Sequence, residues 1–190
     1  MIPKKIHYCW FGKKPLPPLA IKCINSWKTF LPDFKIIEWN EDNFDINIIP
    51  YTAEAYESKK YAFVSDVARF WILNKFGGIY FDTDVELIKP IYDILEKGGY
   101  MGFEKNADKK SYGFVNPGLG MASEANNKFL SDILQHYKKI HFKNIDGSYN
   151  INKTVVHYTT DLLKEFGLKK APGIQYISDF YIYPSDYFAP

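Results

Sequence analysis

The stretch Tyr61–Phe76 limits the possible folds of this chain more than any other part of the sequence. It contains no glycine or proline, and apolar residues cover nearly all of its helical faces. A helix of this kind is buried inside a protein rather than laid on its surface. Gly77 and Gly78 follow at once, as at many helix ends, and residues 79–81 have the apolar character of a short buried strand. The segment therefore predicts a buried helix that leads into a central sheet.

The rest of the chain alternates between strand and helix patterns. Strand, helix and strand within the first forty residues predict a parallel α/β unit. We expect strands at 6–11, 34–39, 79–81, 100–104, 174–177 and 180–183, a glycine-interrupted strand or loop at 115–122, and helices at 17–30, 51–58, 61–76, 90–95, 126–141 and 154–166. Because there is no internal repeat, low-complexity tract or linker, residues 1–190 are predicted to form one domain.

Charge and cysteine content exclude several classes of protein. The 24 basic and 22 acidic residues give a net charge of +2, and the lysines are scattered in pairs, whereas a nucleic-acid-binding protein concentrates its basic residues in a stripe. Cys9 and Cys23 match no metal-binding or redox spacing. No apolar run approaches the length of a membrane span, and no signal peptide is evident, so the cytoplasm is the expected compartment.

Two aspartates directly follow the strand at 79–81. If Asp82-Thr83-Asp84 continues the extended chain, both carboxylates project to the same side and face one small volume. Like charges so placed favour a divalent cation with a preference for oxygen ligands, such as Mg²⁺ or Mn²⁺. The alternative is a strand end whose aspartates only cap the following turn.

Asp66 and Arg69 lie three residues apart, and therefore on one face of the predicted buried helix. One interpretation is an ordinary surface ion pair, which contributes little to stability. The apolar neighbours on every side argue instead for a functional role. Arg69 is the only arginine among the 24 basic residues, and its planar guanidinium can bind phosphate or carboxylate in a way that lysine cannot.

Three segments together resemble the bacterial capsular-polysaccharide glycosyltransferases of family 32, which carry a DXD sugar-binding motif and are related to yeast mannosyltransferases and clostridial glucosylating toxins. The segments are IPKKIHYCWFG at 2–12, YAFVSDVARF at 61–70 and GGIYFDTDVE at 77–86. The resemblance implies a GT-A fold, which is a Rossmann-like mixed sheet flanked by helices. It also implies a nucleotide-sugar donor, most often a UDP-sugar, and an Mn²⁺ or Mg²⁺ ion.

The resemblance also implies a role for each matching residue. Trp10 would stack on the nucleobase, while Asp66 and Arg69 would bind the sugar hydroxyls and the diphosphate of the donor. Asp82 would contact the ribose or the transferred sugar and also the metal, and Asp84 would ligate the metal directly. Asn116, before Pro117-Gly118, is a candidate for the donor or acceptor side, although a turn asparagine needs no such role.

Members of this family retain the anomeric configuration of the sugar. The sequence offers no obvious second carboxylate as a nucleophile, which favours front-face attack by the acceptor hydroxyl. The expected acceptor is a glycan or a polysaccharide on a lipid carrier, with at most peripheral contact at the inner face of the membrane. Family members commonly continue into a segment with a histidine and a Ser-Trp pair. This sequence ends at Pro190, so either the chain is shortened or water completes the metal shell.

Two other functions stay open at this point. A non-catalytic module could bind a sugar nucleotide or glycan with the same residues. A phosphatase of the haloacid-dehalogenase type could use Asp82 as nucleophile and Asp84 as acid and base on Mg²⁺. That class places its motif near the N-terminus and adds a late Asp-Asp pair, which this sequence lacks.

Overall fold

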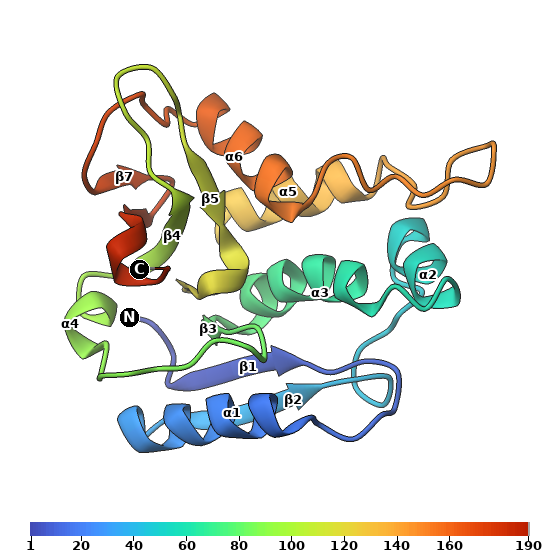
Figure 1. Cartoon of the computed structure of the whole chain (residues 1–190), viewed down its shortest axis with the longest axis horizontal. Helices are drawn as coiled ribbons and strands as arrows, with labels where there is room; N and C mark the ends of the chain where they lie inside the picture. The colour runs from blue at the N-terminus through green and yellow to red at the C-terminus, as the bar shows by residue number, and fades with distance from the viewer. Residues whose placement is uncertain (190) are drawn as a thin grey trace.

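The computed structural model describes residues 1–189 and arranges the strands in one mixed sheet with helices on both faces (Figure 1). The strands are β1 (Lys5–Cys9), β2 (Lys35–Trp39), β3 (Gly78–Tyr80), β4 (Gly99–Lys105), β5 (Phe114–Asn116), β6 (Met121–Ser123), β7 (Gln175–Ile177) and β8 (Phe180–Tyr183). The α-helices are α1 (Pro18–Phe30), α2 (Pro50–Glu57), α3 (Tyr61–Phe76), α4 (Tyr92–Leu95), α5 (Lys128–Tyr137) and α6 (Val155–Glu165). Two short 3₁₀ helices, η1 (Pro117–Leu119) and η2 (Ser185–Tyr187), complete the set.

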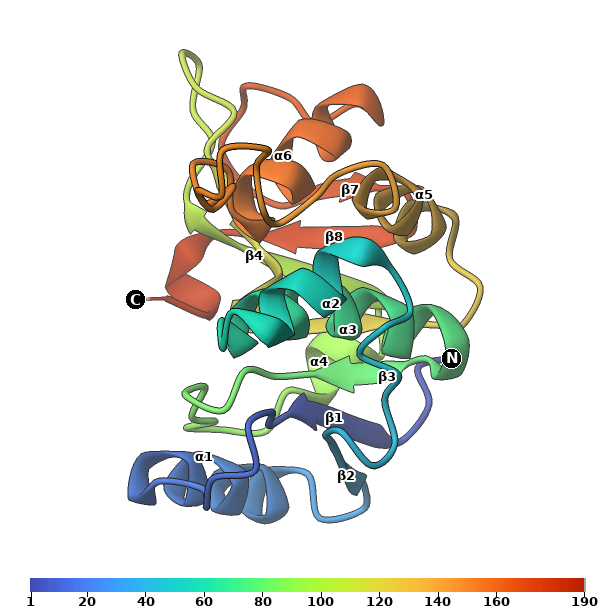
Figure 2. The ribbon, with the colours of Figure 1, turned by 90° about the vertical axis from the view of Figure 1, so that its right-hand side faces the viewer.

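The order of strands across the sheet is β2-β1-β3-β6-β4-β8-β7, with β5 paired to β4. Figure 2 shows the strands stacked from β7 and β8 down to β1 and β2. β1 pairs in parallel with both β2 and β3, as the predicted α/β unit requires. The chain thus leaves β1 toward β2 and later returns on its other side as β3. In open α/β sheets such a reversal leaves a crevice at the carboxyl ends of the strands, where ligands bind.

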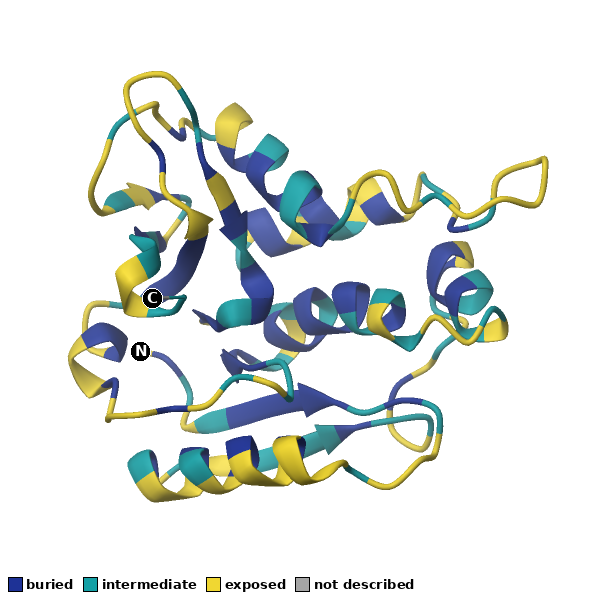
Figure 3. Cartoon of the chain, in the orientation of Figure 1, coloured by how far each residue is buried: buried dark blue, intermediate teal, exposed yellow. Residues whose placement is uncertain are grey.

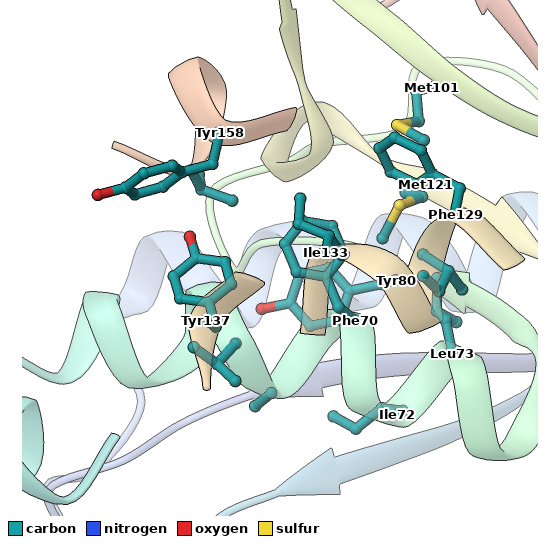
Figure 4. Close-up of a cluster of buried hydrophobic side chains, with 14 of the residues drawn as sticks. Phe70, Ile72, Leu73, Tyr80, Met101, Met121, Phe129, Ile133, Tyr137 and Tyr158 are labelled. Atoms are coloured by element: carbon teal, nitrogen blue, oxygen red, sulfur yellow. The ribbon is translucent and has the colours of Figure 1, made fainter. Parts of the chain in front are cut away.

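The sheet separates two hydrophobic layers, because successive side chains along each strand point to opposite faces. Ile6 and Tyr8 of β1 and Ile79 of β3 face α1 and α4, while Tyr80 faces the layer that contains α3. On that second side, Phe70 and Leu73 of α3 pack with Met121 of β6 and Phe129 of α5, as Figure 4 shows. α3 is consequently buried along most of its length (Figure 3).

The prediction for α3 and its end is confirmed. The helix occupies Tyr61–Phe76 and Gly77 follows with a φ of +59°, in the left-handed region. Gly78 has a φ of +110°, and a Cβ there would lie 2.7 Å from the carbonyl oxygen of Lys5 in the neighbouring β1. Glycine at this position therefore permits the close parallel pairing of β3 with β1.

Most boundaries differ from those predicted by one or two residues, and three segments differ by more. α5 occupies only Lys128–Tyr137, because Asn127 caps its start through a hydrogen bond to the amide of Leu130. The segment 115–122 divides into β5, η1 and β6. The extended geometry expected for residues 82–84 is wrong: the amide of Val85 donates to the carbonyl of Asp82 at 3.1 Å, which makes a turn.

Among residues 1–189, no helix has the length and apolar character needed to cross a membrane.

Candidate active site

An open cavity of about 930 Å³ lies at the carboxyl ends of β1 and β3. Its lining comes from five parts of the chain that are far apart in sequence: Cys9, Trp10, Phe11, Lys14, Lys59, Tyr61, Ala62, Ser65, Asp66, Arg69, Asp82, Thr83, Asp84, Asn116, Thr154, Val155 and Val156. All six residues singled out in the sequence are in this set. Because a cavity of this size suits a small-molecule ligand, the predicted site residues do share one candidate binding site, although their individual roles stay predictions.

Trp10 is the first residue after β1 and lies at one wall of the cavity. Its backbone amide donates to the carbonyl of Trp39, which extends the pairing of β1 with β2 by one residue. The indole N–H donates to the carbonyl oxygen of Lys14 at 2.6 Å. The polar edge of this half-buried ring is therefore satisfied within the chain, which leaves its π-face to contact a ligand.

Asp82 lies two residues beyond Tyr80, on the side of the sheet that faces α3. Its Oδ1 accepts hydrogen bonds from the Tyr80 hydroxyl and from Nη2 of Arg69, each at 3.0 Å. The guanidinium also lies over the Tyr80 ring, 5.1 Å from its centroid. These contacts fix the Asp82 carboxylate at the floor of the cavity.

Arg69 joins two carboxylates. Its Nη2 lies 2.9 Å from Oδ1 of Asp66 and 3.0 Å from Oδ1 of Asp82, while Nε donates to the carbonyl of Ser65. The Arg69 side chain is only 4% exposed, so the interpretation as a surface ion pair is excluded. Nη2 and Nε are occupied within the chain, which makes Nη1 the nitrogen left for a ligand. Arg69 can therefore offer a diphosphate only one nitrogen, whereas an unpaired guanidinium could bind it through two.

The ionisable groups at the cavity floor are strongly affected by burial. Burial raises the pKa of Asp66 to about 6, against the opposing influence of Arg69. Burial also raises the pKa of Asp82, with Arg69 and the Tyr80 hydroxyl acting in the other direction. The same effect raises the pKa of the Cys9 thiol to about 12, so this cysteine stays protonated and is not a nucleophile.

Asn116 and Gly118 approach the two charged groups from β5 and η1. Asn116 Oδ1 accepts from the Gly118 amide at 2.8 Å, and its Nδ2 donates to the Glu104 carboxylate at 3.0 Å. Both ends of the Asn116 amide are thus engaged within the chain, although the residue lines the cavity. A Cβ on Gly118 would lie 2.3 Å from Oδ2 of Asp82 and 3.1 Å from Nη1 of Arg69. This close approach requires glycine.

We expect Gly118→Ala to weaken ligand binding in the cavity on the order of tenfold, because Asp82 must move away from the added methyl group and small misplacements in a site have large effects. Titration calorimetry with UDP, the nucleotide that the sequence resemblance implies, measures the affinity. Gly173→Ala is the control, since this position has open space around it but a φ of +92°. The added methyl group there strains the backbone but meets no other atom, so the affinity of this variant for UDP should equal that of the unmodified protein. Equal affinities in all three proteins would contradict the steric argument.

The residues present fit a divalent cation that is shared with a ligand. Asp84 is exposed at the edge of the cavity, and the hydrogen bonds to Asp82 use Oδ1 and not Oδ2. Within residues 1–189 no three or more histidine, cysteine or acidic side chains are grouped to enclose a metal ion. One or two carboxylates, completed by phosphate oxygens and water, are a usual environment of Mg²⁺ in phosphate-binding sites.

No motif or spacing in the sequence points to Lys14, Lys59 or the start of α6 as site residues. Thr154, Val155 and Val156 reach the cavity only because α6 packs against β5, a contact between segments about forty residues apart. The amino-terminal ends of α3 and α6 both border the cavity, and such ends favour anions. The histidines were not assigned to the site, and none lines it: His7 is fully buried, while His141 pairs with Glu54 and His157 caps α6.

Comparisons with known proteins identify the family of this chain. Residues 17–100 match the family described as "Glycosyltransferase sugar-binding region containing DXD motif". An uncharacterised glycosyltransferase, L373, of Acanthamoeba polyphaga mimivirus is 30% identical over 99% of this chain and 75% of its own length. Inositol phosphoceramide mannosyltransferase 3 of Schizosaccharomyces pombe is 26% identical over 84% of this chain, which spans only 42% of that protein. The solved structure of the PaToxG glycosyltransferase superposes with a TM-score of 0.58 at 20% identity, covering 86% of this chain and 69% of that one.

Proposed function

This chain belongs to the glycosyltransferases whose sugar-binding region contains a DXD motif, and we propose that it transfers a hexose from a UDP-sugar to a hydroxyl group of a glycan or lipid-linked acceptor. Its sheet has the GT-A architecture. The observation that supports the donor assignment most is the meeting of Trp10, Asp66, Arg69, Asp82, Asp84 and Asn116 around one cavity at the point where the strand order reverses.

In the proposed complex the uracil ring stacks on Trp10 and the diphosphate lies toward Asp84. Asp66 is the buried hydrogen-bond acceptor for sugar hydroxyls, and Arg69 bridges the carboxylates of Asp66 and Asp82 and orients both. The amino-terminal ends of α3 and α6 add partial positive charge near the donor phosphates. Asn116 lies on the side of the cavity formed by β5 and η1, where its contacts hold Gly118 close to Asp82.

We propose that Asp84 and Oδ2 of Asp82 hold the divalent cation, with Mn²⁺ or Mg²⁺ as the expected ion. When bound, such an ion stabilises the negative charge that develops on the departing nucleoside diphosphate. The contribution of the protein's own residues is to hold the ligand-binding groups in place. Asp82 is fixed by Tyr80 and Arg69 before the donor arrives, so little reorganisation is needed during the reaction.

Retention of configuration through front-face attack is part of the proposal. The carboxylates that line the cavity are those of Asp66, Asp82 and Asp84. The first two are already paired with Arg69 and the third is assigned to the cation, so none is left as a free nucleophile. The acceptor hydroxyl would then approach on the side of the leaving diphosphate, whose oxygen accepts its proton. An inverted product in an anomer-resolved NMR assay, or a trapped glycosyl-enzyme adduct, would contradict this route.

The acceptor is proposed to be a growing glycan on a lipid carrier. One fission-yeast relative is named for mannosyl transfer to inositol phosphoceramide, which is also a lipid-linked acceptor. The enzyme would then work in the cytoplasm with peripheral contact to the inner face of the membrane.

A thermal-shift panel of nucleotide sugars, with and without Mn²⁺, tests the proposal. A ligand at a hundred times its dissociation constant stabilises the native state by about 2.7 kcal/mol, or about 5–10 °C for a chain of this size. We expect this shift with a UDP-sugar and Mn²⁺ together and a much smaller one without the ion. No shift with any nucleotide sugar would refute the donor assignment. Binding with no transfer to any acceptor and no slow hydrolysis of the donor would favour the non-catalytic module.

A further inference from the structure

The segment between α5 and α6 projects from the body of the protein as a hairpin (Figure 1). Lys143 pairs with Tyr149 in an antiparallel bridge, and the amide of Asn144 donates to the carbonyl of Ser148 at 2.8 Å. The amide of Gly147 donates to the carbonyl of Asn144, which closes a tight turn at the tip. Residues 143–149, called the tip hairpin below, are therefore a built element with its own hydrogen bonds.

Two carboxylates of α2 hold the tip hairpin, and one of them, Glu57, lies 3.2 Å from the Lys143 ammonium. Glu54 accepts hydrogen bonds from the backbone amides of Phe142 and Lys143, at 2.8 and 3.0 Å, and pairs with the His141 ring at 2.6 Å. Tyr149 stacks on Phe142, with ring centroids 5.2 Å apart. These contacts fix the direction in which the hairpin projects.

An apolar residue of the tip hairpin is fully exposed to water. Ile145, in the turn itself, is 110% exposed, and Ile151 just beyond the hairpin is 50% exposed. The only acidic residue of the hairpin, Asp146, is bonded to the amide and hydroxyl of Ser148. The exposed Ile145 side chain adds nothing to the core, and a second exposed isoleucine, Ile151, follows it in the same loop, so the two are candidates for an apolar contact outside the chain.

Exposed lysines lie in the segments next to the tip hairpin. Lys138 and Lys139 precede it at the end of α5, and Lys59 and Lys60 lie in the turn between α2 and α3, with the Lys60 ammonium 5.7 Å from the centre of the Tyr149 ring. All four are exposed, and within residues 1–189 none forms a salt bridge. The turn between α2 and α3, the loop after β1 and the tip hairpin lie on the same side of the molecule, at the right of Figure 1 and facing the viewer in Figure 2.

We propose that the tip hairpin docks on a lipid bilayer that contains anionic lipids, with Ile145 and Ile151 in the apolar boundary and the lysines against the headgroups. Apolar side chains at the headgroup boundary and basic side chains against anionic lipids are two contributions that add when a protein surface binds a membrane reversibly. A bilayer satisfies both features of this surface, whereas an acidic protein partner would satisfy the lysines and leave Ile145 in water.

Docking in this way would bring the active-site cavity close to the membrane, and this part of the inference rests on the proposed function. The chain runs from the hairpin directly into Thr154, Val155 and Val156, which line the cavity. The Lys59 side chain belongs both to the cavity lining and to the basic surface. A membrane at the hairpin would therefore place the cavity beside acceptors carried by lipids.

Co-sedimentation with vesicles tests the docking. We expect the protein to bind vesicles of phosphatidylcholine with phosphatidylserine, to bind pure phosphatidylcholine weakly, and to be released by high salt. Ile145→Asp should weaken the binding about tenfold or more, since it replaces an inserted apolar group with a charge. Lys138→Glu with Lys139→Glu should also weaken it. Ile174→Asp is the matched control, because Ile174 is 45% exposed, precedes β7 on the other side of the molecule and should bind as the unmodified protein does.

Thermal shifts with the UDP-sugar and Mn²⁺, measured on the same proteins without vesicles, separate this inference from the proposed function. The Ile145→Asp variant should keep its full shift. Vesicle binding that is absent, or unchanged by Ile145→Asp, overturns the docking even if the donor binds. Dimerisation in solution that Ile145→Asp abolishes would also overturn it, because the apolar tip would then be an interface between proteins.

Discussion

Replacing Asp84 by asparagine is expected to abolish the binding of UDP that depends on Mn²⁺ and to lower the transfer rate on the order of 100-fold or more. The side chain keeps its size, so the change removes one negative charge and little else. Asp84 is exposed in a turn at the edge of the cavity and makes no salt bridge within residues 1–189. The stability of the fold should therefore change by less than about 0.5 kcal/mol. A large loss of binding without a loss of stability is the result that identifies a ligand-binding carboxylate.

Asp93→Asn provides the matched control for this experiment. Asp93 is also exposed but lies in α4, on the opposite face of the sheet from α3. Titration calorimetry with UDP, with and without Mn²⁺, should give the same affinities for this variant and for the unmodified protein. If Asp84→Asn keeps both its affinity for UDP with Mn²⁺ and its transfer rate, the assignment of Asp84 to the cation is wrong.

Local patterns were sufficient to predict the segment that carries Asp66 and Arg69. Tyr61–Phe76 is apolar on almost every face and ends at two glycines, so its helical state and its burial follow from neighbours in sequence. The turn at 82–84 was not predictable in this way. Its geometry depends on the Asp82 amide, which lies 3.4 Å from the carbonyl of Gly118, and on Oδ1, which is held by Arg69. Both partners come from other elements.

The partners of Arg69 illustrate the same limit. A spacing of three residues predicted its pair with Asp66, because the helix alone brings them together. Its second partner, Asp82, follows from the packing of α3 on β3, and that contact made Arg69 a buried bridge instead of a free fork for phosphate. Thr154–Val156 were missed for the same kind of reason, since no local pattern indicates that α6 begins at the cavity.

Replacing Arg69 by methionine should destabilise the protein by about 3 kcal/mol at neutral pH. Removing one member of a buried ionic cluster leaves uncompensated charge, with typical losses of about 3–5 kcal/mol. Asp66 and Asp82 both contact the same nitrogen, Nη2, so without it two carboxylates face each other. The lower end of the range applies because the Asp82 side chain is 32% exposed and water can reach it. Urea unfolding followed by circular dichroism measures the loss, and Lys75→Met, at an exposed position of the same helix, should change stability by less than about 1 kcal/mol.

The pH dependence of this loss distinguishes repulsion between the carboxylates from simple loss of packing. The pKa of Asp66 is about 6 even with Arg69 present, and removing the guanidinium raises the pKa values of both carboxyls further. The folded variant then binds more protons than its unfolded chain between about pH 4 and pH 6 and above, so its stability falls as pH rises through that interval. The destabilisation should accordingly be smaller near pH 5 than near pH 8. Asp66→Asn in the Arg69→Met background should recover part of the loss near pH 8, because only one carboxylate then remains. The loss of stability could instead be the same at both pH values, with no recovery in the double variant. Arg69 would then stabilise the fold through packing, and repulsion between the Asp66 and Asp82 carboxylates would contribute nothing.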